Sequence, residues 1–350
     1  MINVRKGSFS RILSVGGYQP SINVPNSEIV DRIDSSDEWI RQRTGIESRR
    51  FGAEHESVLF MAEAACRQAI ERANIPMTDI DTVIVATITF PYQAPSAATA
   101  LIARLGNPTA AAFDISAACA GFCYGVGMAS DLIRSGTSKY VLVVGVEKLS
   151  DFTNPDDRAT AFIFADGAGA VVIGPSEEPG IGPMVWGSDA ENRDAILLEP
   201  SWTDIKKGDS AALGPTLTQQ GQTVFRWAVF SMSKVGTQIL EAAGVTPDQL
   251  DAFIPHQANV RIIESMAREI GIPENVVIAK DIRTAGNTSA ASIPLAMSAL
   301  LEEQPSLHGG LALLIGYGAG LVYAGQVVTL PPAPFTSKSQ GKSETTKRDN

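Results

Sequence analysis

Cysteine and histidine are both scarce in this chain, which has three of each among its 350 residues. An odd, low number of cysteines argues against a disulfide framework and favours a reducing compartment, so we expect a cytoplasmic protein. The closest pair, Cys119 and Cys123, has no histidine or further cysteine nearby in sequence, so no metal site is expected. The opening residues MINVRKGSFS contain no apolar run, and a signal peptide is therefore not expected either.

Basic residues are in the minority: 28 Lys and Arg stand against 38 Asp and Glu, which gives a formal net charge of -10. Such an acidic chain is poorly suited to bind nucleic acid, because that affinity comes largely from neutralising phosphates. An acidic protein partner would need a local basic patch. The most apolar stretch, 311–328, carries several glycines and matches an earlier segment, so we expect a buried strand there and no membrane insertion.

The chain does contain an internal repeat, in which three pairs of segments recur in the same order. The pairs are AIERANIPMTDIDTVIVA (69–86) with ILEAAGVTPDQLDAFIPH (239–256), DISAACAGFCYGVGMASDLIRSG (114–136) with DIRTAGNTSAASIPLAMSALLEE (281–303), and VLVVGVE (141–147) with ALLIGYG (312–318). Their offsets are 170, 167 and 171 residues. Each half alternates helical patterns with short apolar strands, which predicts mainly parallel sheets covered by helices.

We therefore predict an α/β fold of two similar halves, 1–175 and 176–330, packed as a pseudo-dimer and followed by a disordered tail over 331–350. The alternative is two unrelated α/β segments that share common patterns. Ligands of open α/β sheets bind beyond the carboxyl ends of the strands. In a duplicated fold these ends can meet, so residues of both halves are expected to build one site.

Cys119 is the candidate nucleophile. It lies between a predicted strand end and a long apolar helix, where the helix dipole and free N–H groups favour a thiolate. Its small neighbours, Ala117, Ala118, Ala120 and Gly121, allow a sharp turn and a close approach of substrate. The alternative is a packed core cysteine, which is what we expect of Cys66 and Cys123.

Two polar residues of the second half are candidate partners of that nucleophile. His256 ends a predicted strand, whereas His55 and His308 lie in polar segments and are expected to be exposed. Asn287 lies in TAGNTSAAS, which pairs with the Cys119 segment in the repeat, so the two residues are predicted to begin equivalent helices. A structural histidine and a helix-capping asparagine are the alternatives.

A glycine-rich loop, GYGAG at 316–320, follows the last apolar strand. Its spacing is G-x-G-x-G, and no long helix with a later acidic residue follows it, so it does not match a dinucleotide-binding fingerprint. We expect a tight loop whose backbone N–H approaches a reacting oxygen.

Taken together, these residues resemble the family of β-ketoacyl-acyl-carrier-protein synthase III, the initiating condensing enzymes of type II fatty acid synthesis. The resemblance runs from Ser35 to about Pro331. The matching motifs are SSDEWIRQRTGI (35–46), AACAGF (117–122), DRATAFIFADGAGAVV (157–172), PHQAN (255–259) and GNTSAAS (286–292). It implies a duplicated thiolase-like fold with five layers, α-β-α-β-α, and a homodimer.

The resemblance also implies the chemistry. Cys119 would take an acyl primer from acyl-CoA, with the backbone N–H groups of Cys119 and Gly318 as oxyanion hole. His256 and Asn287 would stabilise the enolate formed when malonyl on acyl-carrier protein loses carbon dioxide, and that enolate would attack the acyl group. Acyl-CoA and malonyl-acyl-carrier protein are then substrates, and no cofactor is expected. Elongating relatives have a second histidine in place of the asparagine, and thiolases use a second cysteine.

Binding residues follow from the same resemblance. Trp39 and Arg158 would flank the adenine of coenzyme A, and Arg43 with Thr44 would meet its phosphates or base. The remaining assignments are Gly221, Phe225, Ala258 and Asn259 for the pantetheine channel, Ala94 and Phe164 for the acyl pocket, and Arg226, Arg261 and Arg268 for a patch that binds carrier protein. The alternatives are an ordinary helix anchor for Trp39 and a solvated charged face for the arginines.

The chain departs from the family pattern in three places. Residues 283–287 read RTAGN, one residue longer than the usual R-x-G-N, and the glycine loop reads GYGAGL instead of GFGGG. Ala94 stands where relatives often carry an aromatic residue that closes the acyl pocket of the partner subunit, so primers longer than acetyl are expected. Three other functions stay open: a condensing enzyme of secondary metabolism, a silent acyl-binding subunit, and a nicotinamide-dependent oxidoreductase.

Overall fold

Two five-stranded sheets form the framework of the chain, whose computed structural model describes residues 7–334. The first sheet has the order β1-β7-β6-β4-β5 and the second β8-β14-β13-β11-β12. The strands of the first sheet are β1 (Phe9–Tyr18), β4 (Thr82–Ala86), β5 (Ala111–Ile115), β6 (Val141–Lys148) and β7 (Asp166–Ser176). Those of the second are β8 (Val185–Ser188), β11 (Ala252–Pro255), β12 (Val277–Ile278), β13 (Leu311–Gly318) and β14 (Val322–Thr329).

The two sheets have the same topology. In the first, β4 pairs in parallel with β5 and β6, and β7 joins β6 and β1 antiparallel. In the second, β11 pairs in parallel with β12 and β13, and β14 joins β13 and β8 antiparallel. The central strands are almost continuously apolar because both faces are covered. This equivalence confirms the predicted duplication.

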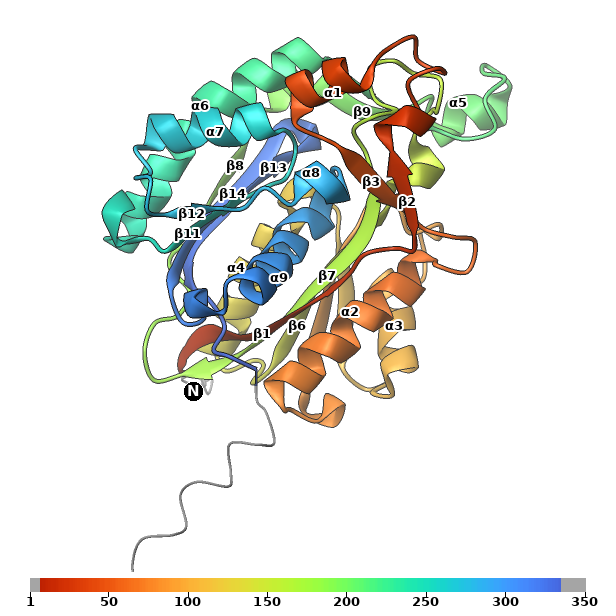
Figure 1. Cartoon of the computed structure of the whole chain (residues 1–350). Coiled ribbons are helices and arrows are strands. Elements are labelled where there is room, and N and C mark those ends of the chain that lie inside the picture. The colour runs from red at the N-terminus through yellow and green to blue at the C-terminus, as the bar shows by residue number, and fades with distance from the viewer. Residues whose placement is uncertain (1–6, 335–350) are drawn as a thin grey trace, which may run out of the picture.

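Helices lie on the outside of each sheet and between the sheets. They are α1 (Asp37–Thr44), α2 (Val58–Ala73), α3 (Ala97–Leu105), α4 (Gly121–Arg134), α5 (Trp202–Lys207), α6 (Gly221–Ala243), α7 (Val260–Ile270), α8 (Ile282–Ala285) and α9 (Ser292–Glu303). Helices α2 and α3 cover one outer face, α6 and α7 cover the other, and α4 and α9 fill the middle (Figure 1). The middle helices are apolar around most of their circumference because they face a sheet on each side. The predicted five-layer arrangement is confirmed.

The structure corrects one offset of the sequence repeat. A short 3-10 turn precedes each middle helix: Ala118–Ala120 before α4 and Ser289–Ala291 before α9. These turns correspond to each other at an offset of 171 residues. The offset between β6 and β13 agrees with this value to within one residue. Cys119 therefore corresponds to Ala290. Helices α4 and α9 are the equivalent helices, and Asn287 lies three residues before Ala290, so Cys119 and Asn287 precede these helices at different distances.

Two glycines bring the halves into close contact. A Cβ on Gly145 of β6 would lie 2.1 Å from the carbonyl oxygen of Ala290, and one on Gly316 of β13 would lie 3.0 Å from Cα of Ala120. The central strand of each half thus contacts the 3-10 turn of the other half, as a pseudo-twofold axis requires. At Gly145 the approach leaves no room for a side chain, so glycine is required there, and at Gly316 a Cβ would meet the backbone of the turn tightly.

The remaining elements cover the site from the sides. Two small antiparallel sheets pair β2 (Ile22–Pro25) with β3 (Ser48–Phe51) and β9 (Ile196–Glu199) with β10 (Thr216–Gln219). Helix α1 begins at the N-cap Ser36, whose side chain accepts the Trp39 N–H, and ends at Gly45 in the left-handed region.

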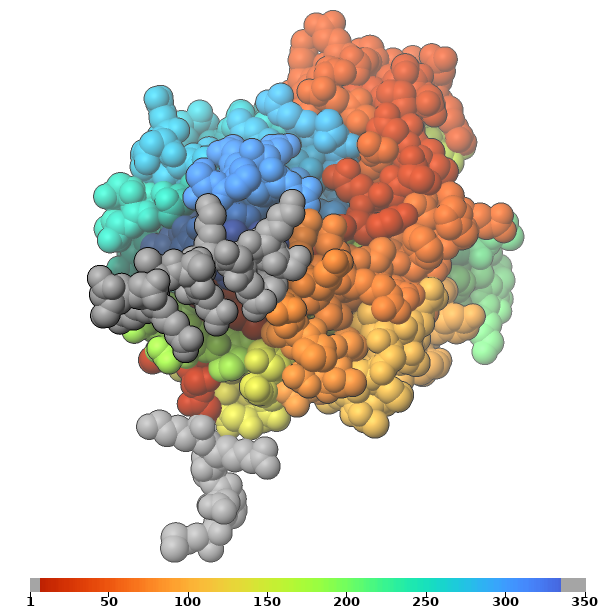
Figure 2. Space-filling model, turned by 60° about the horizontal axis from the view of Figure 1, so that its bottom comes forward, coloured from red at the N-terminus to blue at the C-terminus, as the bar shows by residue number. Residues whose placement is uncertain are grey.

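The two halves share one outer surface, and the last two strands form a hairpin. In Figure 2 the orange part of the first half and the blue part of the second half adjoin on one surface. Over residues 7–334 we find no helix long and apolar enough to cross a membrane, and the apolar stretch 311–328 is the β13–β14 hairpin. The boundary predicted at 175/176 coincides with the end of β7 and stays a prediction. Most of the predicted disordered tail, 335–350, lies outside the described residues.

Candidate active site

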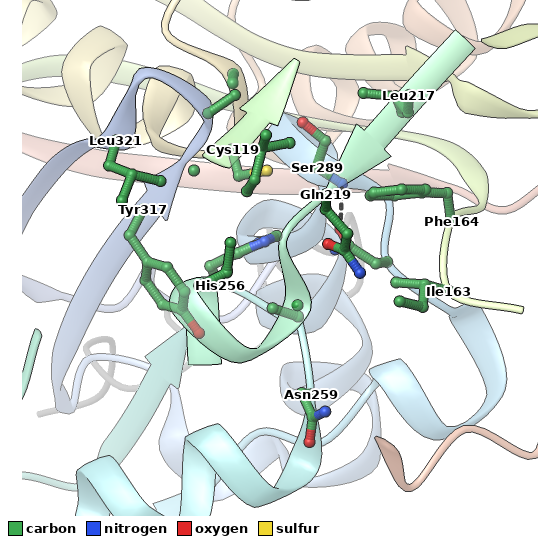
Figure 3. A pocket seen from close by; sticks show the side chains of 18 of the residues that line it. Cys119, Ile163, Phe164, Leu217, Gln219, His256, Asn259, Ser289, Tyr317 and Leu321 are labelled. Carbon is green, nitrogen blue, oxygen red and sulfur yellow. Dashed lines mark hydrogen bonds between the residues drawn. The ribbon is translucent and has the colours of Figure 1, made fainter. Parts of the chain in front are cut away.

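The carboxyl ends of β5, β11 and β13 deliver residues to one pocket. Cys119 follows β5, His256 follows β11 directly, and Gly318 ends β13. Asn287, which follows α8, lines the same pocket, so residues of both halves converge as predicted. In Figure 3, Cys119 and His256 both lie at the edge of this space.

The half-buried Cys119 lies in the 3-10 turn before α4, directly after Ala118, whose φ of 43° is in the left-handed region. Burial raises the pKa of the Cys119 thiol to about 12, a hydrogen bond from Ser289 lowers it, and the nearby Glu147 carboxylate raises it further. Burial and the Glu147 charge thus oppose the thiolate that the sequence predicts here, and α4 itself begins only at Gly121, two residues after Cys119.

His256 is a neutral imidazole in this site. Only 2% of its surface is exposed, and this burial lowers its pKa to about 3. Its Nδ1 lies 2.7 Å from the Ser292 hydroxyl, which also accepts the Gln257 backbone N–H at 3.3 Å. Because Ser292 still has its own proton to donate, Nδ1 is best assigned as the acceptor, which places the imidazole proton on Nε2. The ring is further held by an edge contact with Tyr317 at 5.2 Å.

Asn287 has a fixed orientation. Its Oδ1 accepts the backbone N–H of Ser289 at 2.9 Å, and its own backbone N–H donates to Ile163 at 2.9 Å. The Nδ2 amide hydrogens are therefore left to point into the pocket. The site thus offers two donors from the second half, Nε2 of His256 and Nδ2 of Asn287.

Gly318 approaches the candidate nucleophile more closely than any side chain would allow. A Cβ at this position would lie 2.8 Å from the Cys119 backbone nitrogen and 2.9 Å from its sulfur. The backbone of Gly318 is extended, with φ of -175°, so glycine is required for space and not for conformation. Only the later Gly320 has a positive φ, at 107°.

A second, wider hollow continues from the pocket to the surface and shares Ile163, Gln219, Gly221, Phe225 and Asn259 with it. All residues predicted to bind coenzyme A line one of the two spaces: Trp39, Arg43, Thr44, Arg158, Gly221, Phe225, Ala258 and Asn259. The guanidinium carbons of Arg43 and Arg158 each lie 5.7 Å from the centre of the Trp39 ring. Asp34 pairs with Arg158 at 3.4 Å.

Two of these residues use their polar groups within the protein. The Thr44 hydroxyl donates to Ile40 at 2.8 Å and accepts from Ile46 at 3.1 Å. Asn259 caps α7 through the Arg261 N–H and donates to the Arg43 carbonyl at 3.0 Å. Asn259 therefore joins the start of α7 to the end of α1, whereas the Thr44 hydroxyl bonds within and just after α1.

The predicted arginine patch is only partly assembled at the hollow. Arg226 and Arg261 line its mouth, and the guanidinium of Arg261 lies 5.2 Å from the centre of the Phe225 ring. Arg268, two helical turns further along α7, does not line it. The exposed pair Lys280 and Glu264, 2.7 Å apart, places a negative charge on the same helix.

The two residues predicted for the acyl pocket lie in different hollows. Phe164 lines the Cys119 pocket, whereas the exposed Ala94 lines a separate hollow beside Tyr92 and Trp202. Among the described residues of this single chain, Ala94 therefore does not face Cys119. The apolar wall near the sulfur comes from residues that the sequence analysis missed: Ile88, Leu149, Ile196, Leu217 and Leu321. Ile196 and Leu217 belong to the two-stranded β9–β10 sheet, which the repeat did not contain.

Sequence reasoning also missed three polar residues of the site: Glu147, Ser289 and Ser292. Both serines fall in the motif GNTSAAS and Glu147 ends the repeated strand VLVVGVE, so the segments were found but the residues were not. The other predictions for cysteine and histidine are mostly confirmed. Cys66 and Cys123 are fully buried and His55 is exposed, but His308 is half-buried and contacts the Pro331 carbonyl at 2.9 Å. Within residues 7–334 no cluster of metal-ligating side chains is found.

Known proteins resemble this chain along both halves. Two family models match it: 3-oxoacyl-[acyl-carrier-protein] synthase III over residues 113–190 and the C-terminal part of that synthase over 240–330. The chain is 54% identical over 340 residues to β-ketoacyl-[acyl-carrier-protein] synthase III 1 of Streptomyces coelicolor, a match that covers 94% of this chain and 99% of that protein.

Solved structures give the same result. A priming β-ketosynthase of a polyketide biosynthetic pathway superposes with a TM-score of 0.92 and 44% identity, covering 95% of this chain and 99% of that one. The 3-oxoacyl-[acyl-carrier-protein] synthase III from Aquifex aeolicus superposes with a TM-score of 0.83 and 37% identity, covering 91% and 99%.

Proposed function

The chain belongs to the β-ketoacyl-[acyl-carrier-protein] synthase III family of initiating condensing enzymes, and we propose that Cys119, His256 and Asn287 carry out the condensation in the pocket described above. The observation that carries this assignment is the convergence of one sulfur and two oriented donors from different halves. Cys119 attacks the carbonyl carbon of an acyl-CoA thioester, and the coenzyme A thiolate leaves. The backbone N–H groups of Cys119 and Gly318 hold the transient oxyanion.

His256 and Asn287 act in the second half-reaction. Their Nε2 and Nδ2 hydrogens donate to the thioester oxygen of malonyl on acyl-carrier protein and stabilise the enolate formed as carbon dioxide leaves. A neutral imidazole and a carboxamide suit this role, because neither places a competing negative charge beside the enolate. The enolate carbon then attacks the acyl group on Cys119 and releases the sulfur, which gives a 3-oxoacyl-acyl-carrier protein.

The outer hollow is the proposed binding site of coenzyme A. The indole of Trp39 is covered on its faces by guanidinium groups, so a flat adenine can replace the Arg158 contact and stack in its place. The pantetheine arm would then run past Gly221, Phe225 and Ala258 to Cys119. For the carrier protein, Arg226 and Arg261 at the mouth are the better supported part of the patch, since Arg268 lies outside it.

The primer is proposed to be longer than acetyl. The Cys119 pocket has an extended apolar wall that includes Phe164, Leu149 and Leu217, and burial of a longer chain there is favourable by about 0.8 kcal/mol per methylene. Ala94 contributes to this preference only if a partner subunit brings it to the pocket, and the homodimer is itself part of the proposal.

An acyl-CoA series tests the function. We would incubate the protein with acetyl-, isobutyryl- and longer acyl-CoA, detect the acyl adduct on Cys119 by mass spectrometry, and then add malonyl-acyl-carrier protein. We expect adducts on the wild type and none on Cys119→Ser. Asn287→Ala is expected to form the adduct but to lose decarboxylation and condensation. Condensation by Asn287→Ala at the full rate would refute its role, and strict preference for acetyl would refute the proposed primer.

A role in secondary metabolism is the second candidate, favoured by the structural similarity to a polyketide priming synthase. The chemistry at Cys119 would be the same and only the carrier protein would differ. Condensation with a fatty-acid carrier protein and a polyketide carrier protein, compared under identical conditions, separates the two roles.

A further inference from the structure

One residue of the apolar wall stands between the Cys119 pocket and a second hollow. We call this second space the Ala94 hollow, since Ala94 lines it together with Tyr92 and Trp202. Among the described residues that line the two spaces, Ile88 is the single one that they share. The side chain of Ile88 is half-buried, so it is held by packing on one side and borders open space on the other. It therefore forms the partition between pocket and hollow.

The β9–β10 sheet borders both spaces. Its residues Ile196 and Leu217 line the pocket, whereas Leu198 lines the hollow. Leu198 is the direct cross-strand partner of Leu217, so the two side chains lie on the same face of the sheet with about 5 Å between their Cβ atoms. Ile88, Ile196 and Leu198 are all partly buried against one apolar cluster that contains Leu217. An apolar surface therefore continues from the pocket to the hollow past Ile88.

A fully buried carboxylate holds Ile88 in this place. Strand β4 ends at Ala86, and the backbone N–H of Ile88, beyond the strand, donates to Oε2 of Glu147 at 3.1 Å. The hydroxyls of the two flanking residues donate to the same oxygen, Thr87 at 3.1 Å and Thr89 at 2.7 Å. Because Glu147 has no exposed surface, water does not compete for these bonds. Three consecutive residues are thus anchored on one side chain, and this sets the direction in which the middle one points.

The same anchor is bonded to a neighbouring strand and to the other half of the molecule. Glu147 lies in β6, and the backbone N–H of the next residue, Lys148, donates to the Thr89 hydroxyl at 2.9 Å. From the second half, the Ser289 hydroxyl donates to Oε1 of Glu147 at 3.3 Å. The segment that carries Ile88 is therefore fixed by hydrogen bonds to two other parts of the fold, and Ile88 cannot move aside without breaking them.

We propose that Ile88 limits the length of the primer by closing the Cys119 pocket toward the Ala94 hollow, and that Glu147 is the positioning residue that holds Ile88 there. This inference rests on the proposed function, in which the occupant of the pocket is the acyl chain on Cys119. That chain is apolar along its length, so it follows the apolar wall away from the sulfur. Its end meets Ile88 before it can reach Leu198 in the hollow. The accepted primers are therefore those that end at Ile88.

The test compares primers of different length on the same protein. Wild type and Ile88→Ala are each mixed with equal concentrations of isobutyryl-, hexanoyl- and octanoyl-CoA, and the early acyl adducts on Cys119 are quantified by intact-protein mass spectrometry. In Ile88→Ala the ratio of octanoyl to isobutyryl adduct should rise by about fourfold for each methylene that gains a buried place, hence by about fifteenfold for two. An unchanged ratio would overturn the proposal, because another group, such as a partner subunit, would then close the pocket.

Ile196→Ala is the matched control. It removes the same atoms from the wall of the Cys119 pocket, at a residue that does not line the Ala94 hollow. The pocket becomes wider beside the acyl chain and no deeper, so we expect a gain for the branched isobutyryl primer and none for octanoyl. An equal gain for octanoyl in Ile196→Ala and Ile88→Ala would show that the width of the pocket limits the primer, and this result would also overturn the proposal.

Glu147→Gln tests the positioning role. The amide keeps the length of the side chain but turns an NH₂ group toward donors that the carboxylate accepts, so Ile88 is held less firmly. The octanoyl-to-isobutyryl ratio should rise, by less than in Ile88→Ala, and the double variant should match Ile88→Ala alone. Equal slowing with every primer at a constant ratio would show a merely structural role and refute the positioning.

The same experiment separates this inference from the proposed function. If the wild type forms no adduct on Cys119 with any acyl-CoA, the proposed function fails. If the wild type is acylated and Ile88→Ala shows the same order of preference among the three primers, only the role of Ile88 fails.

Discussion

At the scale of single residues, the site depends on hydrogen bonds that fix which atoms face the substrate. Ser292 and Ser289 are small, buried and adjacent in the chain to the start of α9, yet each determines the orientation of a neighbouring group. Ser292 selects the proton position on His256, and the Ser289 N–H selects the orientation of the Asn287 amide. Neither effect involves a charge, so both depend on distance and burial alone.

The role of Ser292 can be measured. In Ser292→Ala, His256 loses the partner of Nδ1, so the proton can occupy either ring nitrogen. We expect condensation to slow by about tenfold, the equivalent of one neutral hydrogen bond, with acylation of Cys119 unchanged. Single-turnover rates of the two half-reactions provide the readout. Ser233→Ala, which removes a buried hydroxyl bonded to the Val229 carbonyl in α6, is the matched control. An equal loss in both half-reactions would contradict the assignment.

At the scale of elements, the pocket is formed by two 3-10 turns and the strand ends that pack against them. Both turns begin with a residue in the left-handed region, Ala118 with φ of 43° and Ser289 with φ of 48°. Gly145 and Gly316 let the central strand of each half approach the turn of the other. These contacts join residues that are far apart in the sequence. The same close approach of a strand to a turn occurs in both halves.

Gly318 at the end of β13 allows a direct test of this close approach. In Gly318→Ala, the added methyl would lie 2.9 Å from the Cys119 sulfur and must displace either the turn or the strand end. We expect acylation to fall by about a hundredfold, as for loss of an oxyanion donor, while the far-UV circular dichroism stays unchanged. Gly214→Ala, whose nearest neighbour is Trp202 at 3.7 Å, is the control. Normal acylation would show that the oxyanion hole lies elsewhere.

At the scale of the whole molecule, the buried ionisable groups couple stability to pH. The pKa of Glu147 is raised by burial to about 7 from an ordinary value of 4.5, so the folded state holds that proton more tightly than the unfolded state. Its contribution to stability is therefore complete below about pH 4.5 and is lost as the pH rises to 7. His256 has the opposite dependence: burial lowers its pKa to about 3, so stability is lost as the pH falls below 6.5.

Glu147→Gln isolates the first of these effects, because His256 is common to both proteins. The free energy of unfolding of the variant, relative to wild type, should increase by on the order of 3 kcal/mol between pH 4.5 and pH 7. Urea unfolding at a fixed ionic strength and several pH values measures it. Glu178→Gln, at an exposed position after β7, reports what the same change does at the surface. A relative stability that does not vary with pH would show that Glu147 titrates alike in both states.

The sequence by itself determined the local features of this protein. Continuous apolar runs predicted the central strands, because a strand that is buried on both faces is apolar at nearly every position. The repeat predicted two equivalent halves. The rule that ligands lie beyond strand carboxyl ends brought Cys119 and His256 to one place. The repeat pointed to Asn287, and the family resemblance added its role and the residues of the outer hollow. These predictions depend on residues close together in the chain.

The tertiary structure alone decided which side chains touch. It aligned Cys119 with Ala290, used the Thr44 hydroxyl inside α1, and kept Ala94 away from the sulfur within one chain. It also joined Ser289 to Glu147, which lie 142 residues apart. Periodicity records whether a residue is buried, but a hydrogen bond depends on distances of a few tenths of an ångström between segments that only the packed layers bring together.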